Sequence, residues 1–191
     1  MTTPEDDEDK HLLIALAGGN DPALNVLMRR WNARLIAYLH RLTGSHTTAC
    51  DLAQETFVRV YKHRQRYRPN QKFSTWLFAI ATNLARNQLR WQKRHPVTLL
   101  EPSQVSDLPL QCELPTPCHS LERQERAEAV REAILKLPQD YKEPLILSTY
   151  EGLSHAEIAE IMNTTEKVVE MRLYRARKQL KELLLPWLKQ E

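Results

Sequence analysis

The chain has 191 residues, a net charge of +3 at pH 7 and only four glycines, a composition that favours helices over sheets. It holds no run of about 18 apolar residues, which argues against a membrane-spanning helix, and its acidic segment 2–9 is unlike a signal peptide. Three widely spaced cysteines argue against a disulfide framework and for a reducing compartment. We therefore expect a cytoplasmic, all-α protein.

The positive charge is concentrated in one stretch. Residues 56–100 hold ten Lys or Arg and no Asp or Glu, whereas residues 1–55, 101–127 and 128–191 carry net charges of −3, −3 and −1. Seven of the 13 aromatic residues lie in the same stretch. Ten like charges repel one another unless a polyanion supplies the opposite charge, and aromatic rings offer faces on which unpaired bases stack. The stretch predicts a nucleic-acid surface; the alternative is a solvated basic face.

Two helices are predicted before residue 45. The first spans about residues 8–17 and is ended by a pair of glycines. The second begins with Asp21 as N-cap and Pro22 in its first turn, and is ended by Gly44. Apolar residues spaced three and four apart give this helix one buried stripe: Leu24, Leu27, Trp31, Leu35, Tyr38 and Leu42.

Two further helices carry the charged stretch. One is capped by Thr47 or Thr48 and runs to about residue 63, and the other is capped by Ser74 and runs to about residue 94. A basic loop, 64–72, joins them. The residues expected to face inward are Leu52, Phe57, Val60 and Tyr61, then Leu77, Ile80, Ala81, Leu84 and Trp91. Those expected on outward polar faces are Asp51, Gln54 and Glu55, then Thr82, Asn83, Arg86, Asn87 and Arg90.

Residues 96–120 contain five prolines among Ser, Asp and Glu, and predict a flexible, extended linker. The chain therefore divides into an N-terminal domain, 1–95, the linker, 96–120, and a C-terminal domain, 121–191. The spacing of Cys112, Cys118 and His119 matches no zinc site, so we expect free thiols here and no bound metal.

The C-terminal domain has the pattern of a helix-turn-helix. A helix with Ala127, Val130, Ile134 and Leu137 inward is broken by Pro138, and a helix of about ten residues then ends at Gly152. Ser154 and Glu157 form a capping box before a short helix, and residues 163–165 form a tight turn. A longer helix, 166–185, follows, with Val169, Leu173, Ala176, Leu180 and Leu183 inward. This geometry is typical of DNA-binding proteins; the alternative is an amphipathic helix with a solvated basic face.

Three segments resemble the extracytoplasmic-function (ECF) group of bacterial sigma factors. Residues 51–57, DLAQETF, resemble their polymerase-binding segment, and residues 73–85, FSTWLFAIATNLA, resemble the segment that opens promoter DNA. Leu137-Pro138, residues 152–159 and residues 172–177 resemble their C-terminal helix-turn-helix. The resemblance covers nearly all of residues 10–185 and includes the two-domain layout.

The resemblance implies three sets of contact residues. The set that lies against the positively charged clamp of core RNA polymerase is Asp51, Leu52, Gln54, Glu55, Phe57 and Val58. The set that opens or contacts the −10 element is Arg59, Lys62, Lys72, Phe73, Ser74, Thr75, Trp76, Thr82, Asn83, Arg86, Asn87 and Arg90. The set at the −35 element is Ser154, Lys167, Val168, Glu170, Met171, Arg172, Tyr174, Arg175, Arg177 and Lys178.

The function implied is that of an alternative sigma factor, which binds core RNA polymerase, directs it to promoter DNA and helps to open the duplex. No enzymatic activity, cofactor or small-molecule substrate is implied. An anti-sigma factor anchored in the membrane is the expected regulator, it would hold the protein at the inner membrane face, and a stress response is the typical role. Glu170 and Met171 depart from the group's usual residues, which leaves the −35 sequence open.

Two other function classes remain to be separated from this one. A dimeric helix-turn-helix regulator would need only the C-terminal domain and would leave residues 56–100 without a role. A nuclease or helicase accessory would need clustered acids for metal ions, and the sequence has no such cluster.

Overall fold

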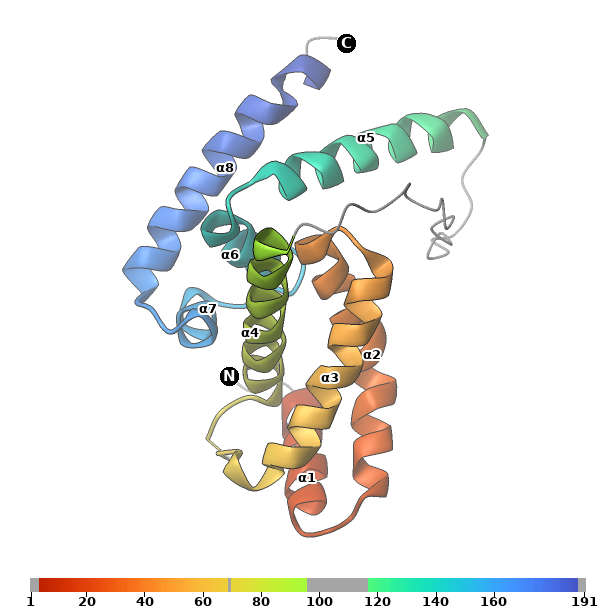
Figure 1. Ribbon diagram of the computed structural model, residues 1–191, viewed down its shortest axis with the longest axis vertical. Helices are drawn as coiled ribbons and strands as arrows, with labels where there is room; N and C mark the ends of the chain where they lie inside the picture. The colour runs from red at the N-terminus through yellow and green to blue at the C-terminus, as the bar shows by residue number, and fades with distance from the viewer. Residues whose placement is uncertain (1–3, 69, 96–116, 189–191) are drawn as a thin grey trace.

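A computed structural model describes residues 4–68, 70–95 and 117–188 (Figure 1). Within these residues there are α-helices and one short 3-10 turn but no strand, so the all-α prediction is confirmed. The helices of the N-terminal unit are α1 (Pro4–Ala17), α2 (Pro22–Thr43), α3 (His46–His63) and α4 (Phe73–Arg94), with the 3-10 turn η1 (Arg64–Arg66) before α4. Those of the C-terminal unit are α5 (Pro117–Lys136), α6 (Gln139–Thr149), α7 (His155–Met162) and α8 (Glu166–Leu188). None of the helices in the described ranges is long and apolar enough to cross a membrane.

The N-terminal unit packs α1, α3 and α4 around α2, whose apolar stripe is the centre of the core. Leu27, Trp31, Leu35, Tyr38 and Leu42 are buried as predicted, and Leu24 is half-buried against them. The rings of two α4 residues, Phe73 and Phe78, lie edge-on to Trp31 at centroid distances of 5.8 and 6.1 Å. The Trp31 indole N–H donates to Asp9 of α1 at 2.8 Å, so that the buried polar atom is satisfied.

Two predicted helix caps are wrong, and a third is confirmed in position. Ser45, not Thr47 or Thr48, caps α3: its extended backbone lets its hydroxyl accept from the Thr48 N–H. Asp21 is the N-cap residue of α2, as predicted, and Pro22 follows it, but the Asp21 side chain makes no capping hydrogen bond. Lys72, not Ser74, is the N-cap position of α4, and Ser74 is buried inside the first turn.

Three residues expected inward are exposed. Trp91 lies near the end of α4, where it stacks on His95 at 5.1 Å instead of entering the core. Leu183 belongs to the last turns of α8, which extend past the other helices (Figure 1). Ala127 is exposed because α5 turns Ala129 and Ala133 toward its neighbours. In addition, α5 begins at Pro117, so the last residues of the predicted linker, including Cys118 and His119, are helical, while Cys112 lies outside the described residues.

The predicted helix-turn-helix is confirmed as α7 and α8. Ser154 and Glu157 make both hydrogen bonds of the capping box at the start of α7. Asn163 ends α7 in the left-handed conformation, with φ 50° and ψ 55°, which a side-chain amide tolerates better than most residues do. The predicted break at Pro138 also occurs, because this proline precedes the first turn of α6.

The two units lie against each other. The short helix α7 packs on α4, while α5 and α6 pack on α2 (Figure 1). Gly44, which ends α2 with φ 74°, lies so close to Leu135 of α5 that an added Cβ would be 3.2 Å from that side chain. This packing brings the carboxylates of one unit to the cations of the other.

The turn at Asn163 provides a stability test. Replacing Asn163 with Gly should change the free energy of unfolding by less than about 0.5 kcal/mol, whereas Asn163→Val should lower it by about 1–2 kcal/mol, because a branched side chain opposes the left-handed conformation. Urea unfolding followed by circular dichroism measures both variants. Equal stability of the two would show that the turn does not constrain this backbone.

Candidate nucleic-acid and protein interfaces

One side of α3 is a stripe that we call the α3 stripe, made of Asp51, Gln54, Glu55 and Val58. Asp51 and Gln54 are exposed, and Val58 is 42% exposed beside them. Glu55 is half-buried and accepts from Arg59 at 2.8 Å. A carboxylate-rimmed apolar side chain suits a partner protein with a positive surface.

The other two residues of the predicted polymerase-binding set are placed differently. Leu52 and Phe57 are buried, with exposures of 8% and 2%, because they form the inner face of the same helix. They hold α3 on the core and leave the contact with a partner to the α3 stripe.

The predicted −10 residues divide between core and surface. Phe73, Ser74, Thr75 and Thr82 are buried. Arg59 is paired with Glu55, and Lys62 is exposed on α3. The remaining six share one side of α4, and we call them the α4 surface: Lys72, Trp76, Asn83, Arg86, Asn87 and Arg90.

Thr82 belongs to the packing between α2 and α4. Its hydroxyl donates to the Phe78 carbonyl at 2.7 Å and accepts from Tyr38 at 2.6 Å. Complete burial raises the pKa of Tyr38 well above its ordinary value, so this phenol remains a donor at all physiological pH values. The Thr82 side chain fixes how α4 sits on the core and does not reach the surface.

A cavity that sequence reasoning missed lies beside the α4 surface. It has a volume of about 480 Å³ and is lined by Arg66, Arg68, Asn70, Gln71, Trp76 and Glu160. The Trp76 ring packs on Tyr67 with centroids 5.5 Å apart, which fixes the wall of the cavity. Two arginines and an aromatic wall suit an unstacked base and its phosphate. The predicted basic loop, 64–72, was the one sign of this cavity in the sequence. Because a loop has no periodic pattern, the sequence did not indicate which loop residues would line a common cavity.

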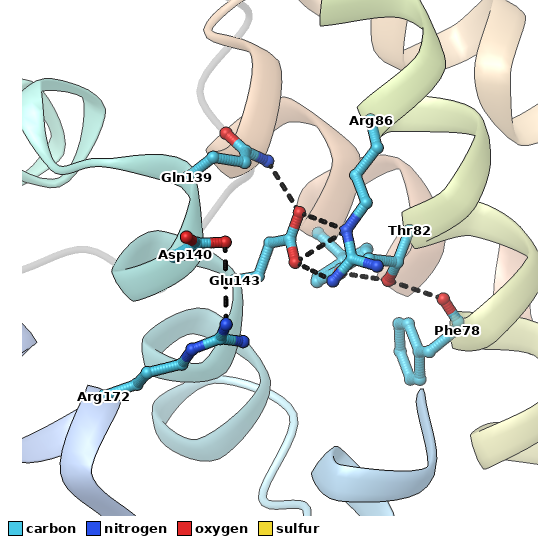
Figure 2. Close-up of polar contacts among 8 residues, drawn as sticks. Phe78, Thr82, Arg86, Gln139, Asp140, Glu143 and Arg172 are labelled. Atoms are coloured by element: carbon cyan, nitrogen blue, oxygen red, sulfur yellow. Dashed lines mark hydrogen bonds and ion pairs between the residues drawn. The ribbon is translucent and has the colours of Figure 1, made fainter. Parts of the chain in front are cut away.

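Carboxylates of the C-terminal unit contact the α4 surface. The Arg86 guanidinium donates hydrogen bonds to the Glu143 carboxylate from two of its nitrogens, Nε and Nη2. The Nε atom lies 2.9 and 3.0 Å from the two carboxylate oxygens (Figure 2). Gln139 donates to the same carboxylate at 3.0 Å. The hydrogen bonds that Arg86 donates to Glu143 raise the pKa of Arg86 above its ordinary value, although burial opposes this. Lys72 pairs with Glu157 at 3.0 Å.

A larger cavity of about 680 Å³ lies between α4 and the start of α6. The cations on its wall are Arg86, Arg90, Lys93, Lys136, Lys142 and Arg172. Burial lowers the pKa of Lys142, and nearby Lys93 lowers it further, whereas Glu143 acts in the opposite direction. The Lys142 ammonium is held by the Leu135 carbonyl at 2.8 Å.

The predicted −35 residues lie on and before α8. Tyr174 is 70% exposed, and Lys167, Glu170, Met171, Arg175, Arg177 and Lys178 are exposed as well. Val168 and Arg172 are half-buried, and Ser154 is exposed at the capping box of α7. The exposed side of α8 therefore presents Lys, Arg, Met and Tyr side chains that can enter a major groove or reach phosphates.

Thr82 provides a test of its structural role. Replacing Thr82 with Val should lower the free energy of unfolding by about 1–2 kcal/mol, because the Tyr38 hydroxyl loses its acceptor in the core. The folded variant should bind single-stranded DNA as the wild type does, while Arg90→Ala should weaken binding. Urea unfolding and fluorescence anisotropy measure these effects. Weaker DNA binding by Thr82→Val at full stability would make this hydroxyl a direct contact.

Comparison with known families matches both units separately. The family model described as Sigma-70 region 2 matches residues 27–95, and the model described as Sigma-70, region 4 matches residues 127–180. The first match spans most of α2 together with α3 and α4, and the second spans the second half of α5 together with α6, α7 and part of α8.

Similar proteins match over almost the full length. An ECF RNA polymerase sigma-E factor of Haemophilus influenzae is 31% identical over 182 residues, which cover 93% of this chain and 96% of that protein. An RNA polymerase sigma-H factor of Pseudomonas aeruginosa is 29% identical, and the alignment covers 100% of both chains.

Solved structures show the same fold. CnrH in complex with the cytosolic domain of CnrY has a TM-score of 0.69 and 26% identity, covering 93% of this chain and 97% of that one. The sigma factor RpoE of Bartonella quintana, in complex with the anti-sigma factor NepR, has a TM-score of 0.64 and 24% identity, covering 84% of this chain and 95% of that one.

Proposed function

Because the chain belongs to the ECF sigma factors of RNA polymerase, we propose that three of its surfaces divide the work of transcription initiation. The protein is an alternative sigma factor without enzymatic activity, which binds core RNA polymerase and directs it to promoters. The α3 stripe would bind the polymerase, the α4 surface the −10 element, and the exposed side of α8 the −35 element. The observation that carries this assignment is the distribution of charge: acids in the α3 stripe, cations without any acid on α4, and an excess of cations on α8.

The α3 stripe is suited to the polymerase because its acids are close to the DNA-facing cations without being part of them. Asp51 lies about two turns before the first cation of the acid-free stretch, Arg59, and Gln54 lies about one and a half turns before it. A negative contact at this position attracts a basic partner surface and repels DNA phosphates. The exposed Val58 adds apolar area at the centre of the same contact.

The α4 surface is suited to separated strands because cations alternate with a ring and amides on one rigid helix. Unpairing a base costs a few kcal/mol, and stacking on an aromatic ring returns about 1–3 kcal/mol per base. Trp76 offers the ring, and Asn83 and Asn87 offer amides that can read base edges. Arg86 and Arg90 supply phosphate contacts at helical spacing.

The exposed side of α8 is suited to the −35 element. Lys167, Glu170 and Met171 lie in its first turns, where a recognition helix meets base edges, and Arg175, Arg177 and Lys178 follow where phosphates lie. Glu170 cannot bind a phosphate or a guanine but can accept from a cytosine amine, so we infer a cytosine opposite it.

We propose a domain division that follows from these surfaces: an N-terminal domain to residue 95 and a C-terminal domain that starts at Pro117. The regulatory partner we infer is an anti-sigma factor, on the support that RpoE was solved with one and CnrH was solved with the cytosolic domain of CnrY. We propose further that this partner is anchored in the membrane and that the sigma factor acts in the cytoplasm, where core polymerase is found.

Charge reversal on α3 tests the polymerase contact. Asp51→Arg should lower run-off transcription with purified core polymerase at least about tenfold. The variant loses the proposed charge contact with the polymerase and is repelled by its basic surface, and together these should weaken the binding free energy by more than about 1.4 kcal/mol. The matched control is Asp21→Arg, an exposed acid at the start of α2 and outside the α3 stripe, which should transcribe normally.

Polymerase binding, measured with a fluorescent label on the sigma factor, should also distinguish these two variants. Asp51→Arg should bind weakly and Asp21→Arg like the wild type, with equal circular dichroism for all three. Normal polymerase binding by Asp51→Arg would contradict the proposed role of the α3 stripe. A wild-type chain that protects an operator from nuclease without polymerase would favour the dimeric regulator instead.

A further inference from the structure

The cavity of about 680 Å³ between α4 and the start of α6 has no part in the proposed function, apart from two shared arginines, Arg86 and Arg90. Its volume lies in the range of about 300–1,000 Å³ that is typical of small-molecule sites. Its walls come from α4, the end of α5, the start of α6, α7 and α8 (Figure 2). The space between several helices is a common place for a ligand in an all-α protein.

The charged side chains on the wall of this cavity are unbalanced. Six are cations and two, Asp140 and Glu143, are acids. Glu143 is already bound by the Arg86 guanidinium. Asp140 has a side chain that is 73% exposed, and it lies 3.9 Å from Arg172, which is too far for a hydrogen bond. Three of the cations form no ion pair with a carboxylate of the described residues: Arg90, Lys93 and Lys142.

Lys142 differs from the other two unpaired cations because it is buried. The residue is 7% exposed, and one of its three ammonium donors bonds to the Leu135 carbonyl at 2.8 Å. No other acceptor in the described parts of the chain receives a hydrogen bond from this ammonium. Burial and nearby Lys93 lower its pKa, and the carboxylate of Glu143 does not compensate for them. A buried cation with unused donors is costly, and an anion in the cavity would remove this cost.

The rest of the lining indicates what kind of anion fits. Several wall residues are apolar: Leu89, Leu135, Leu137, Pro138 and Met162. An inorganic ion would leave these side chains in contact with water, whereas an organic ligand would cover them. Three unpaired cations suit a ligand with several negative charges, and the forked guanidinium of Arg90 matches the geometry of a phosphate.

We propose that this cavity binds a nucleoside di- or triphosphate, with its phosphates on Arg90, Lys93 and Lys142 and its organic part on the apolar wall. The molecule is a ligand and undergoes no chemical step. The chain therefore binds a small molecule directly, in addition to its protein and DNA partners. The argument uses the lining of the cavity alone and does not depend on the roles proposed for the α3 stripe, the α4 surface and α8.

Lys142 separates this ligand from promoter DNA, which carries the same phosphate groups. A DNA strand that follows α4 can reach the exposed side chain of Arg90. The ammonium of Lys142 is buried and faces the cavity, so it is reached from within the cavity. Loss of this ammonium should therefore weaken the binding of a nucleotide and leave the binding of DNA unchanged.

The decisive variant is Lys142→Met, which keeps the buried carbon chain and removes the ammonium. The probes are ATP and GTP, each titrated into the full chain in magnesium-free buffer by isothermal titration calorimetry. The wild type should bind one nucleotide per chain, and Lys142→Met should bind it at least about tenfold more weakly, because a charge-assisted hydrogen bond in a buried site is worth that factor. The matched control is Lys181→Met, which removes an exposed cation of α8 outside the cavity and should bind within about twofold of the wild type.

Three further probes define the ligand. AMP, with one phosphate, should bind more weakly than ATP, and inorganic triphosphate should do so because it has no part that covers the apolar wall. A fluorescein-labelled, mixed-sequence single-stranded DNA of about 20 nucleotides, followed by anisotropy, should bind equally to the wild type and to Lys142→Met. An equal loss of nucleotide and DNA binding in Lys142→Met would assign the cavity to the DNA backbone and overturn the proposal.

The proposal would also be overturned if neither ATP nor GTP bound to the wild type, or if both bound equally to folded Lys142→Met. Equal affinity for ATP and AMP, or for ATP and inorganic triphosphate, would contradict it too. If circular dichroism shows that Lys142→Met does not fold, Lys93→Met decides in its place, because Lys93 is exposed at the end of α4 and lies outside the α4 surface. None of these measurements contains polymerase, so a failure of run-off transcription remains a separate result.

Discussion

The buried ion pair between Arg86 and Glu143 is the contact around which the rest of this structure is arranged. A buried carboxylate that loses its guanidinium is costly, whereas the same two groups are well hydrated once they are apart in water. The pair is therefore costly to break for as long as Glu143 stays buried. Residues 56–100 contain no acid, so Arg59 pairs with Glu55 just before the stretch, whereas Lys72 and Arg86 pair with carboxylates from a distant part of the chain.

The inner and outer sides of α4 have different tasks. Phe73, Phe78 and Thr82 hold the helix rigidly on α2, while the cations and amides of the α4 surface follow at helical spacing on the other side. A helix held in this way keeps its surface groups at fixed distances from one another, which a loop does not. The same division appears on α3, where Leu52 and Phe57 face the core and Asp51 faces outward.

Much of the fold was predictable because helices repeat every 3.6 residues and end at recognisable residues. The stripe on α2, the capping box at Ser154 and the turn at Asn163 follow from local spacing alone. Thr82 was wrongly predicted to lie on the surface. Its hydroxyl can be buried because it forms a hydrogen bond with Tyr38, which is 44 residues away in the chain and so is not visible in local spacing. The contact between Glu143 and α4 was missed for the same reason: Arg86 and Glu143 are separated by 57 residues, and no periodic pattern predicts such a pair. Local spacing placed the site residues on the right helices but did not say which of them meet.

Gly44 sits at a second place where the two units meet. Its left-handed backbone ends α2, and its missing side chain leaves room for Leu135 of α5. Any larger residue would strain the turn, and its Cβ would lie 3.2 Å from the Leu135 side chain, so that this side chain would have to shift by a few tenths of an ångström. A single codon change at this position would thus loosen the fit between the N-terminal and C-terminal units, with no change in any residue of the α3 stripe, the α4 surface or the exposed side of α8.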